Sequence, residues 1–184
     1  MSTRLSAAER RAAIAGAARD IALDDGLGAI TMRAVGARAG IAPGLVLHYE
    51  AGMDEVVAAA FAGIVRAELD EVRGLELAPL LDTLLDGSRS VVTLIWVQAW
   101  ALAPGNPALA ERVREEMDAW HGMLRAAVEQ HGAAEPDAVA AQILGMIDGL
   151  NAHALVRWGS ERERRALMGR AVEGMLGLAP GSLA

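Results

Sequence analysis

The sequence predicts an all-α protein: an N-terminal three-helix head with a helix-turn-helix, followed by a helical-bundle C-terminal body, with about nine helices in all. Three observations favour this fold. The chain is 53% hydrophobic but only 3% aromatic, and its dominant residues, alanine and leucine, are strong helix formers. Apolar residues recur at three- and four-residue spacing. Glycine, proline or a capping residue stands at most of the expected helix ends.

Three helices are expected in the head. The first, 6–25, opens on a capping box in which a serine and a glutamate satisfy each other's backbone amides. The second, 31–39, starts at a threonine that can cap its first turn, and the third, 43–49, has proline at its first position, where proline is tolerated. Gly40 lies in the short turn between them, and such a pair is typical of a helix-turn-helix. In that motif the second helix enters the major groove of DNA.

Six further helices are expected in the body. A long helix that links head to body ends near Gly74, and its first turn carries Asp54 and Glu55, where the helix dipole favours acids. The segment 88–103 is apolar nearly all round, so we expect it to be the buried central helix of the body. The other expected helices span 77–85, 106–131, 136–158 and 160–177. The predicted domains are a DNA-binding head, 1–51, and a ligand-binding and dimerisation body, 52–184.

A series of residues in the head follows the pattern of a known family. It comprises the glycine after the first helix, the threonine that opens the second, the turn, and the residues of the third helix: Gly26, Thr31, Ala39, Gly40, Ile41, Gly44, His48 and Tyr49. Over about 6–61 the chain thereby resembles the TetR family of one-component transcriptional regulators. The chain departs from the pattern at Ala42, where the family usually has a capping Ser or Thr. It also departs at Glu50 and Met53, where the family commonly has Phe and a phosphate-contacting Lys.

The resemblance and the helix positions together give the expected DNA contacts. The recognition helix offers few polar side chains to base edges, because only His48 and Tyr49 carry hydrogen-bonding groups there. Apolar contact with thymine methyl groups and recognition of DNA shape would supply part of the specificity. The expected contact residues are Thr31, Arg33, Pro43, Gly44, Leu45, His48 and Tyr49.

The charge distribution is compatible with a DNA-binding head. The whole chain has a net charge of −7, which by itself argues against a nucleic-acid partner. The first 50 residues, however, carry six arginines and five acidic residues, whereas the remainder carries eleven arginines and nineteen acidic residues. The excess negative charge therefore lies in the body, and the head is close to neutral.

The body contains candidate residues for binding a small effector. Large apolar pockets with a few polar groups, often between helices of a bundle, are the usual small-molecule sites. Aromatic, methionine and polar side chains on three of the expected helices fit this composition: Trp96, Trp100, Met117, Trp120, His121 and Asn151. The alternative is that these residues belong to an ordinary core, which is the commoner role of buried tryptophan and methionine.

The last two long helices carry more apolar surface than a single buried face needs, which indicates a second packing partner. The residues concerned are Ile143, Met146, Ile147, Leu150, Leu155, Val172 and Met175. The resemblance implies that a second copy of the chain covers them in a four-helix bundle, and a two-fold dimer suits a palindromic operator. The alternative is that both apolar arcs face the core of one chain.

Other features of the sequence exclude several classes of protein. The chain has no cysteine, which rules out disulfides and thiolate metal sites and fits a reducing compartment. The N-terminus lacks the apolar region of a signal peptide, and the longest apolar stretch, 91–103, is too short to cross a bilayer. The four histidines are scattered, and we find no catalytic or phosphate-binding motif. We therefore expect no enzymatic activity, no metal and no cofactor.

The sequence thus predicts a cytoplasmic, ligand-responsive transcriptional regulator. It would bind double-stranded DNA as a homodimer on a palindromic operator, and a small apolar effector would release it as a repressor. Two alternatives stay open. The first is a helical ligand-binding or adaptor protein of the same fold with weak or lost DNA binding, which Glu50, Met53 and the apolar recognition helix favour. The second, less favoured, is a small helical enzyme.

Overall fold

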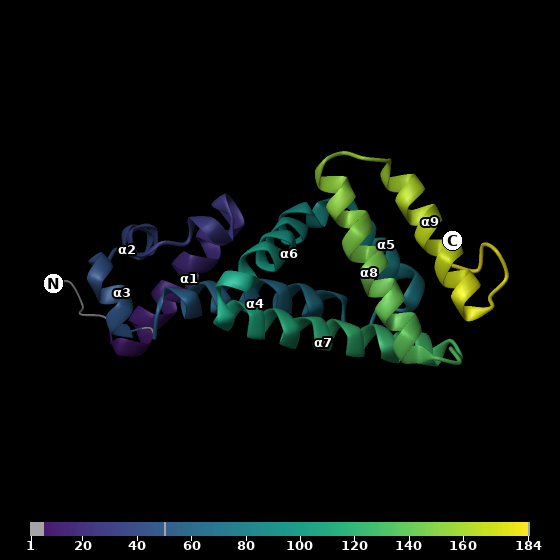
Figure 1. Cartoon of the computed structure of the whole chain (residues 1–184), viewed down its shortest axis with the longest axis horizontal. Helices are drawn as coiled ribbons and strands as arrows, with labels where there is room; N and C mark the ends of the chain where they lie inside the picture. The colour runs from purple at the N-terminus through teal and green to yellow at the C-terminus, as the bar shows by residue number, and fades with distance from the viewer. Residues whose placement is uncertain (1–5, 50, 184) are drawn as a thin grey trace. The chain divides into compact units, whose positions relative to one another are not determined.

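The computed structural model describes residues 6–49 and 51–183, and all regular structure in this part of the chain is helical (Figure 1). Its nine α-helices are α1 (Ala7–Asp25), α2 (Met32–Ala39), α3 (Pro43–Tyr49), α4 (Met53–Val72), α5 (Leu77–Leu85), α6 (Ser90–Leu102), α7 (Pro107–Gln130), α8 (Pro136–Leu155) and α9 (Glu161–Leu176). Short 3-10 turns are η1 (Leu27–Ala29), η2 (Gly87–Arg89) and η3 (Ala103–Gly105). The all-α prediction is confirmed, and most helix bounds agree closely with those expected.

Two expectations about the helices of the body are wrong. The sequence predicts a helix to about Trp158, but α8 ends three residues earlier, and Arg157 has a φ of 59°, a left-handed conformation that cannot continue a helix. The segment expected to be buried nearly all round is α6, yet Val91 and Leu94 in it are 44% and 41% exposed. An apolar composition does not reveal whether a neighbouring element covers each side of a helix.

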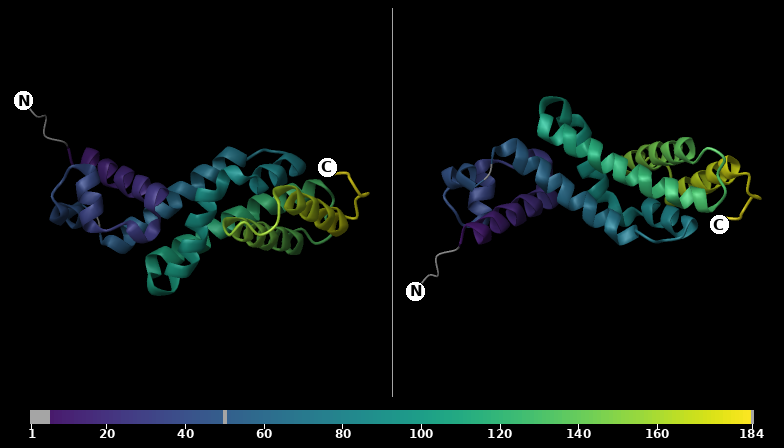
Figure 2. Two further views of the ribbon diagram at one scale, coloured as in Figure 1. Left: turned by 90° about the horizontal axis from the view of Figure 1, so that it is seen from above. Right: turned by 90° about the horizontal axis from the view of Figure 1, so that it is seen from below.

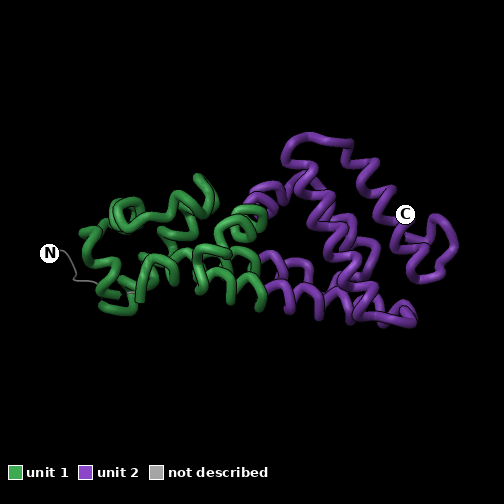
Figure 3. The backbone as a smooth tube through the Cα atoms, viewed as in Figure 1, with its two compact units in different colours: residues 1–67, 95–115 green, residues 68–94, 116–184 purple. Residues whose placement is uncertain are grey.

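The chain divides into two compact units, and each is described by itself (Figure 3). Unit 1 comprises residues 1–67 and 95–115, and unit 2 comprises 68–94 and 116–184. The divisions fall within α4, α6 and α7, so these helices contribute residues to both units. The predicted boundary at 51/52 concerns the DNA-binding function of the head, and it stays a prediction.

Unit 1 is organised around the packing of α1, α2 and α3, which lie together in a cluster (Figure 2). The capping box between Ser6 and Glu9 that was expected to open α1 is present. After α1 the backbone amide of Leu27 donates a hydrogen bond to Oε1 of Gln98 on α6 at 2.7 Å. A side chain at Gly26 would come within 2.6 Å of the Gln98 amide, so the glycine there permits this close approach.

Unit 2 is organised around α5, α8 and α9, which pack on one another. Five leucines of α5 are buried among them: Leu77, Leu80, Leu81, Leu84 and Leu85. The expected capping box between Ser160 and Glu163 opens α9. Asn151 on α8 donates through Nδ2 to the backbone oxygen of Leu84 at 2.8 Å, which ties α8 to the end of α5. None of the described helices combines the length and the apolar character that crossing a bilayer requires.

Candidate functional site

The pair α2–α3 forms the helix-turn-helix that the sequence predicts. The backbone of Thr31 is extended, and its Oγ1 accepts a hydrogen bond from the amide of Ala34 at 3.1 Å, so it caps α2 as expected. Gly40 ends α2 with a φ of 68°, a left-handed conformation that glycine adopts without steric cost. The amide of Ile41 then donates to the oxygen of Gly36 at 2.9 Å, which closes the turn.

Gly36 allows the two helices of the motif to approach each other. A Cβ atom at this position would lie 3.0 Å from the Cα of Pro43 and 3.1 Å from the oxygen of Ile41, and both of these atoms belong to the backbone. Sequence reasoning did not select Gly36. The available signal was a glycine inside a helix of only eight residues, where it has a propensity cost unless packing requires it.

Replacing Gly36 with alanine is expected to lower the free energy of unfolding of the head by about 1–3 kcal/mol, because the added methyl group overlaps the backbone of the turn. Gly16→Ala on α1 is the matched control, since nothing lies within 4 Å of a Cβ there and alanine should raise helix stability by roughly 1 kcal/mol. Urea denaturation followed by circular dichroism measures both. Equal effects of the two substitutions would show that Gly36 is not a packing requirement.

The outer face of α3 is exposed and mainly apolar. Val46 is fully buried and anchors the helix, whereas Leu45 and Leu47 are 36% and 46% exposed. Pro43, Gly44 and His48 are also exposed, so these residues of the predicted contact set are accessible. Leu47 was not among the predicted contacts. The two exposed leucines of α3 are compatible with the predicted apolar contact with thymine methyl groups.

The C-terminal end of α3 is held by two arginines of α1. The Nε atom of Arg11 donates to the backbone oxygen of Tyr49 at 3.3 Å, and the guanidinium carbon of Arg10 lies 5.8 Å from the centre of the Tyr49 ring. The ring of His48 meets that of Tyr49 edge to face, with centroids 5.1 Å apart. Tyr49 is half-buried, so part of its side chain packs at the end of α3 and part stays accessible. Glu50, at which the chain departs from the family pattern, lies outside the described residues.

Arg33 is the cation of α2 that is available for phosphate. It is exposed and has no hydrogen bond or ion pair with any residue that the structure describes. By contrast, Arg38 at the end of the same helix forms an ion pair with Asp24 at 3.0 Å. The predicted phosphate contacts Thr31 and Arg33 are therefore both exposed at the start of α2.

The residues predicted to contact an effector belong to both units. In unit 1, the Trp96 ring meets Phe61 edge to face at 5.0 Å, and its centroid is 5.7 Å from that of Trp100. Both tryptophans are half-buried. The structure thus brings these two predicted residues into contact and adds Phe61, which sequence reasoning missed.

The other four predicted effector contacts, Met117, Trp120, His121 and Asn151, belong to unit 2. Trp120 is 4% exposed, and its buried Nε1 has no hydrogen-bond partner among the described residues. His121 Nε2 lies 3.0 Å from the oxygen of Asp137, and Asn151 binds the end of α5, so these two side chains already have protein partners. Met117 is half-buried.

A partly buried carboxylate of unit 2 was not in the predicted set. Burial, and to a lesser extent the charge of Glu68, raises the pKa of Asp148 on α8 to about 6. Glu68 on α4 is itself buried and lies 3.3 Å from Arg89, which shares its charge with Glu71 at 3.3 Å. Asp148 has no hydrogen bond or ion pair among the described residues. The sequence signal for this site is an acid in the otherwise apolar face of α8.

Four of the seven residues predicted at a dimer interface are buried within the single chain. Ile143 and Val172 are fully buried, and Ile147 and Leu150 are 6% and 9% exposed, so these side chains can add little area to a contact between chains. The remaining three, Met146, Leu155 and Met175, are half-buried. The periodicity showed which faces are apolar, but not that α5 covers one of them.

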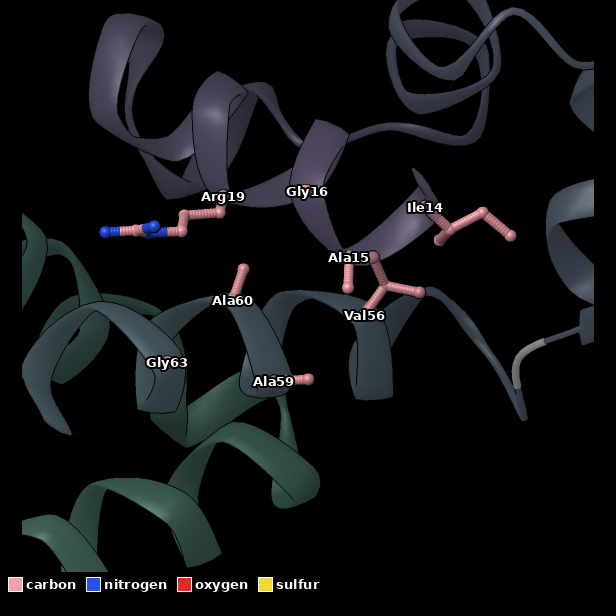
Figure 4. Close-up of a pocket in the computed structure, with 8 residues that line it drawn as sticks. All are labelled: Ile14, Ala15, Gly16, Arg19, Val56, Ala59, Ala60 and Gly63. Atoms are coloured by element: carbon pink, nitrogen blue, oxygen red, sulfur yellow. The ribbon is translucent and has the colours of Figure 1, made fainter. Parts of the chain in front are cut away.

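A cleft of about 240 Å³ lies between α1 and α4 in unit 1 (Figure 4). Small residues form much of its wall, among them Ala15, Gly16, Ala59 and Gly63, and Arg19 is the one charged residue that lines it. With so few polar groups converging on it, the cleft does not have the composition of a specific small-molecule site.

The described residues, all-helical with a helix-turn-helix at the start and a longer helical part after it, have the architecture of helix-turn-helix DNA-binding proteins. Residues 76–177, more than half of the chain, match the family model described as BetI-type transcriptional repressor, C-terminal. The chain belongs to the TetR family of transcriptional regulators, with a C-terminal part of the BetI type. The predicted family and class of function are confirmed.

Several solved protein structures share this fold. One from Rhodococcus sp. Rha1 is 27% identical, with a TM-score of 0.74 over 90% of this chain and 95% of its own. The multidrug-binding protein EbrR, crystallised with proflavin, is 24% identical, with a TM-score of 0.65 over 88% and 98%. A regulator from Saccharomonospora viridis, crystallised with choline, is 17% identical, with a TM-score of 0.71 over 91% and 97%. No curated protein sequence matches the chain.

Proposed function

We propose that this protein is a cytoplasmic, homodimeric repressor, not an enzyme, that binds a palindromic operator and leaves it when a small effector binds. Residues 1–51 would contact DNA, and 52–184 would bind the effector and the second subunit. The observation that carries the proposal is the exposed outer face of α3, held in a complete helix-turn-helix by the Thr31 cap, the Gly40 turn and buried Val46. The proposed contacts with DNA are Thr31, Arg33, Pro43, Gly44, Leu45, His48 and Tyr49.

Replacing Arg33 with alanine is expected to weaken binding to specific and non-specific DNA alike, by about tenfold or less, because the side chain contacts phosphate and not bases. The slope of log affinity against log salt should fall by roughly one unit. Fluorescence anisotropy with labelled duplexes over a salt series measures both quantities. Arg114→Ala on α7 is the control, since Arg114 is also exposed and has no partner among the described residues. An unchanged slope for Arg33→Ala would remove Arg33 from the contacts.

We propose that the effector is a small organic cation with an apolar body. The support lies in unit 2, where the partly buried Asp148 has no hydrogen bond or ion pair among the described residues. A cation near Asp148 would stabilise its ionised form. Proflavin and choline, the ligands crystallised with two structural relatives, are also organic cations. The effector contacts predicted from the sequence stay proposals within each unit: Trp96 and Trp100 in unit 1, and Met117, Trp120, His121 and Asn151 in unit 2.

The proposed dimer would use the outer faces of α8 and α9. On α8, Ala141, Gly145 and Gly149 follow one another at four-residue spacing, and a Cβ at either glycine would meet nothing within 4 Å. On α9, Leu167 is 46% exposed. Small residues in a row allow two helices to pack closely, and an exposed leucine on α9 would add apolar area to the contact.

Replacing Gly145 with leucine is expected to raise the dimer dissociation constant by at least about tenfold, because the new side chain stands where the partner helix would pack. Gly122→Leu is the matched control, since Gly122 lies in α7, is exposed and has nothing within 4 Å of a Cβ. Sedimentation velocity over a micromolar concentration series measures the equilibrium. Unchanged dimerisation of Gly145→Leu would place the contact on another surface.

A further inference from the structure

A small cavity lies within unit 2, and of the site residues predicted from the sequence only Asn151 and Leu155 line it. It has a volume of about 130 Å³ and lies where the start of α6 meets the end of α8 and the start of α9. Its polar lining residues are Asp86, Ser90, Thr93, Asn151 and Arg164. This volume corresponds to roughly four water molecules at liquid density, so the cavity suits a small polar group and not a drug-sized molecule.

Arg164 is a buried cation without a counter-ion. Arg164 is only 9% exposed, and its guanidinium forms no ion pair with any described residue. The guanidinium makes one protein hydrogen bond, from Nη1 to the oxygen of Gly159 at 3.3 Å, and its buried Nε has no partner among the described residues. A buried charge is normally paired with an opposite charge. No described residue provides that charge for Arg164, so a bound anion could provide it.

The neighbouring Arg89 and Arg165 also have a buried Nε without a partner among the described residues, but unlike Arg164 they have counter-ions. Arg165 pairs with Asp82 at 3.3 Å and Glu161 at 3.0 Å, and Arg89 pairs with two glutamates of α4. Arg164 therefore differs from these two arginines because no described carboxylate pairs with it. The difference points to a ligand and not to a general excess of arginine.

The one acid that lines the cavity, Asp86, is already satisfied by its own turn. Its carboxylate accepts hydrogen bonds from the amide and the hydroxyl of Ser88, the first at 2.7 Å. The hydroxyl hydrogen bond is the main cause that lowers the pKa of Asp86, and Arg89 and Arg165 contribute less. Asp86 is therefore ionised at neutral pH, but its charge is stabilised by groups other than Arg164.

The remaining polar groups suit an anion. Ser90 and Thr93 lie three residues apart on the first turn of α6, on the same side of the helix, and each hydroxyl can donate a hydrogen bond into the cavity. The start of this 13-residue helix also carries the positive end of the helix dipole. The Asn151 amide nitrogen is already bound to Leu84, so Asn151 closes one wall.

We propose that this cavity binds a small oxyanion, either inorganic phosphate or the carboxylate of a small acid. Arg164 would supply the charge, and Ser90 and Thr93 would donate hydrogen bonds to the anion's oxygens. Because the cavity joins residues of α6, α8 and α9, an anion in it would link three helices of unit 2. The site does not depend on DNA binding or on the proposed cationic effector.

Calorimetric titration of the full chain with phosphate, and separately with acetate, tests the proposal, with chloride at matched ionic strength as the reference. Wild type should show saturable one-site binding of at least one of the two anions. Arg164→Gln should lose it, while Arg162→Gln, a matched change at an exposed position on the first turn of α9, should retain it. Which anion binds distinguishes phosphate from a small carboxylate as the ligand.

A second variant covers the case in which Arg164→Gln fails to fold. The double substitution Ser90→Ala with Thr93→Val removes two hydroxyl donors, one at an exposed and one at a half-buried position, and it should weaken anion binding by about tenfold. The proposal is overturned if neither anion binds wild type beyond the chloride reference. It is also overturned if folded Arg164→Gln binds as tightly as Arg162→Gln, or if the double variant binds as tightly as wild type. None of these assays contains DNA. Failure of the anion-site proposal would therefore be distinct from failure of the regulator proposal.

Discussion

Replacing Asp148 with asparagine is expected to raise the free energy of unfolding near pH 7.5 by up to about 3 kcal/mol. Burial and Glu68 raise the pKa of this carboxyl from 3.8 to about 6 in the folded chain. Between these two values the folded protein binds more protons than the unfolded chain, so the stability of wild type falls as pH rises through that window. Above it, the folded state carries the full cost of an ionised, poorly solvated carboxylate. Asparagine has a similar shape and carries no such charge.

The same substitution should remove the pH dependence that Asp148 contributes. Urea denaturation at several pH values between about 4.5 and 7.5 would show the free energy of unfolding of wild type falling as the pH rises. In Asp148→Asn the contribution of residue 148 to this fall should be absent. Glu68, the charged group that acts on Asp148, and its partner Arg89 are unchanged in the variant. Asp118→Asn is the control, because it removes the same charge from an exposed position on α7. A destabilised Asp148→Asn would show that the ionised carboxylate is instead stabilised in the folded chain.

Replacing Leu45 with glutamate is expected to reduce operator affinity by at least about a hundredfold, because it places a negative charge beside the phosphates and removes apolar contact with the bases. The fold should persist, since Leu45 is 36% exposed and the anchor of α3 is the adjacent buried valine. Fluorescence anisotropy with a selected operator measures the loss, and thermal unfolding measures the fold.

Leu102→Glu controls for the added charge, because Leu102 is a leucine of α6 that is 40% exposed and lies outside the helix-turn-helix. It should bind operator as wild type does in the absence of effector. If Leu45→Glu binds as tightly as Leu102→Glu, then α3 does not read DNA, and the chain is better explained as a ligand-binding or adaptor protein of the same fold.

The sequence predicted the helices well because their ends depend on residues three or four positions apart. The capping boxes at Ser6 and Ser160, the Thr31 cap and the left-handed Gly40 are local hydrogen-bonding and backbone choices. The end of α8 is the exception, because the conformation of Arg157 has no local sequence signal of the kind that glycine gives. The helix-turn-helix followed from the same local signals, together with the family resemblance.

The contacts that hold the site together could not be predicted in this way, because they join residues far apart in the chain. The hydrogen bond from Arg11 to Tyr49 spans 38 residues, and that from Leu27 to Gln98 spans 71. The contact that requires Gly36 depends on how closely two helices pack, which composition does not reveal. Periodicity likewise identified the apolar faces of α8 and α9, but it could not tell an outer face from one covered by α5.

The most direct test of the regulator account is selection of bound fragments from a random pool of double-stranded DNA with the purified, full chain at moderate salt. The account predicts enrichment of an inverted repeat whose half-sites are spaced for a two-fold dimer, and loss of that enrichment with Leu45→Glu. A folded, dimeric wild-type protein that enriches no sequence over the starting pool would contradict it.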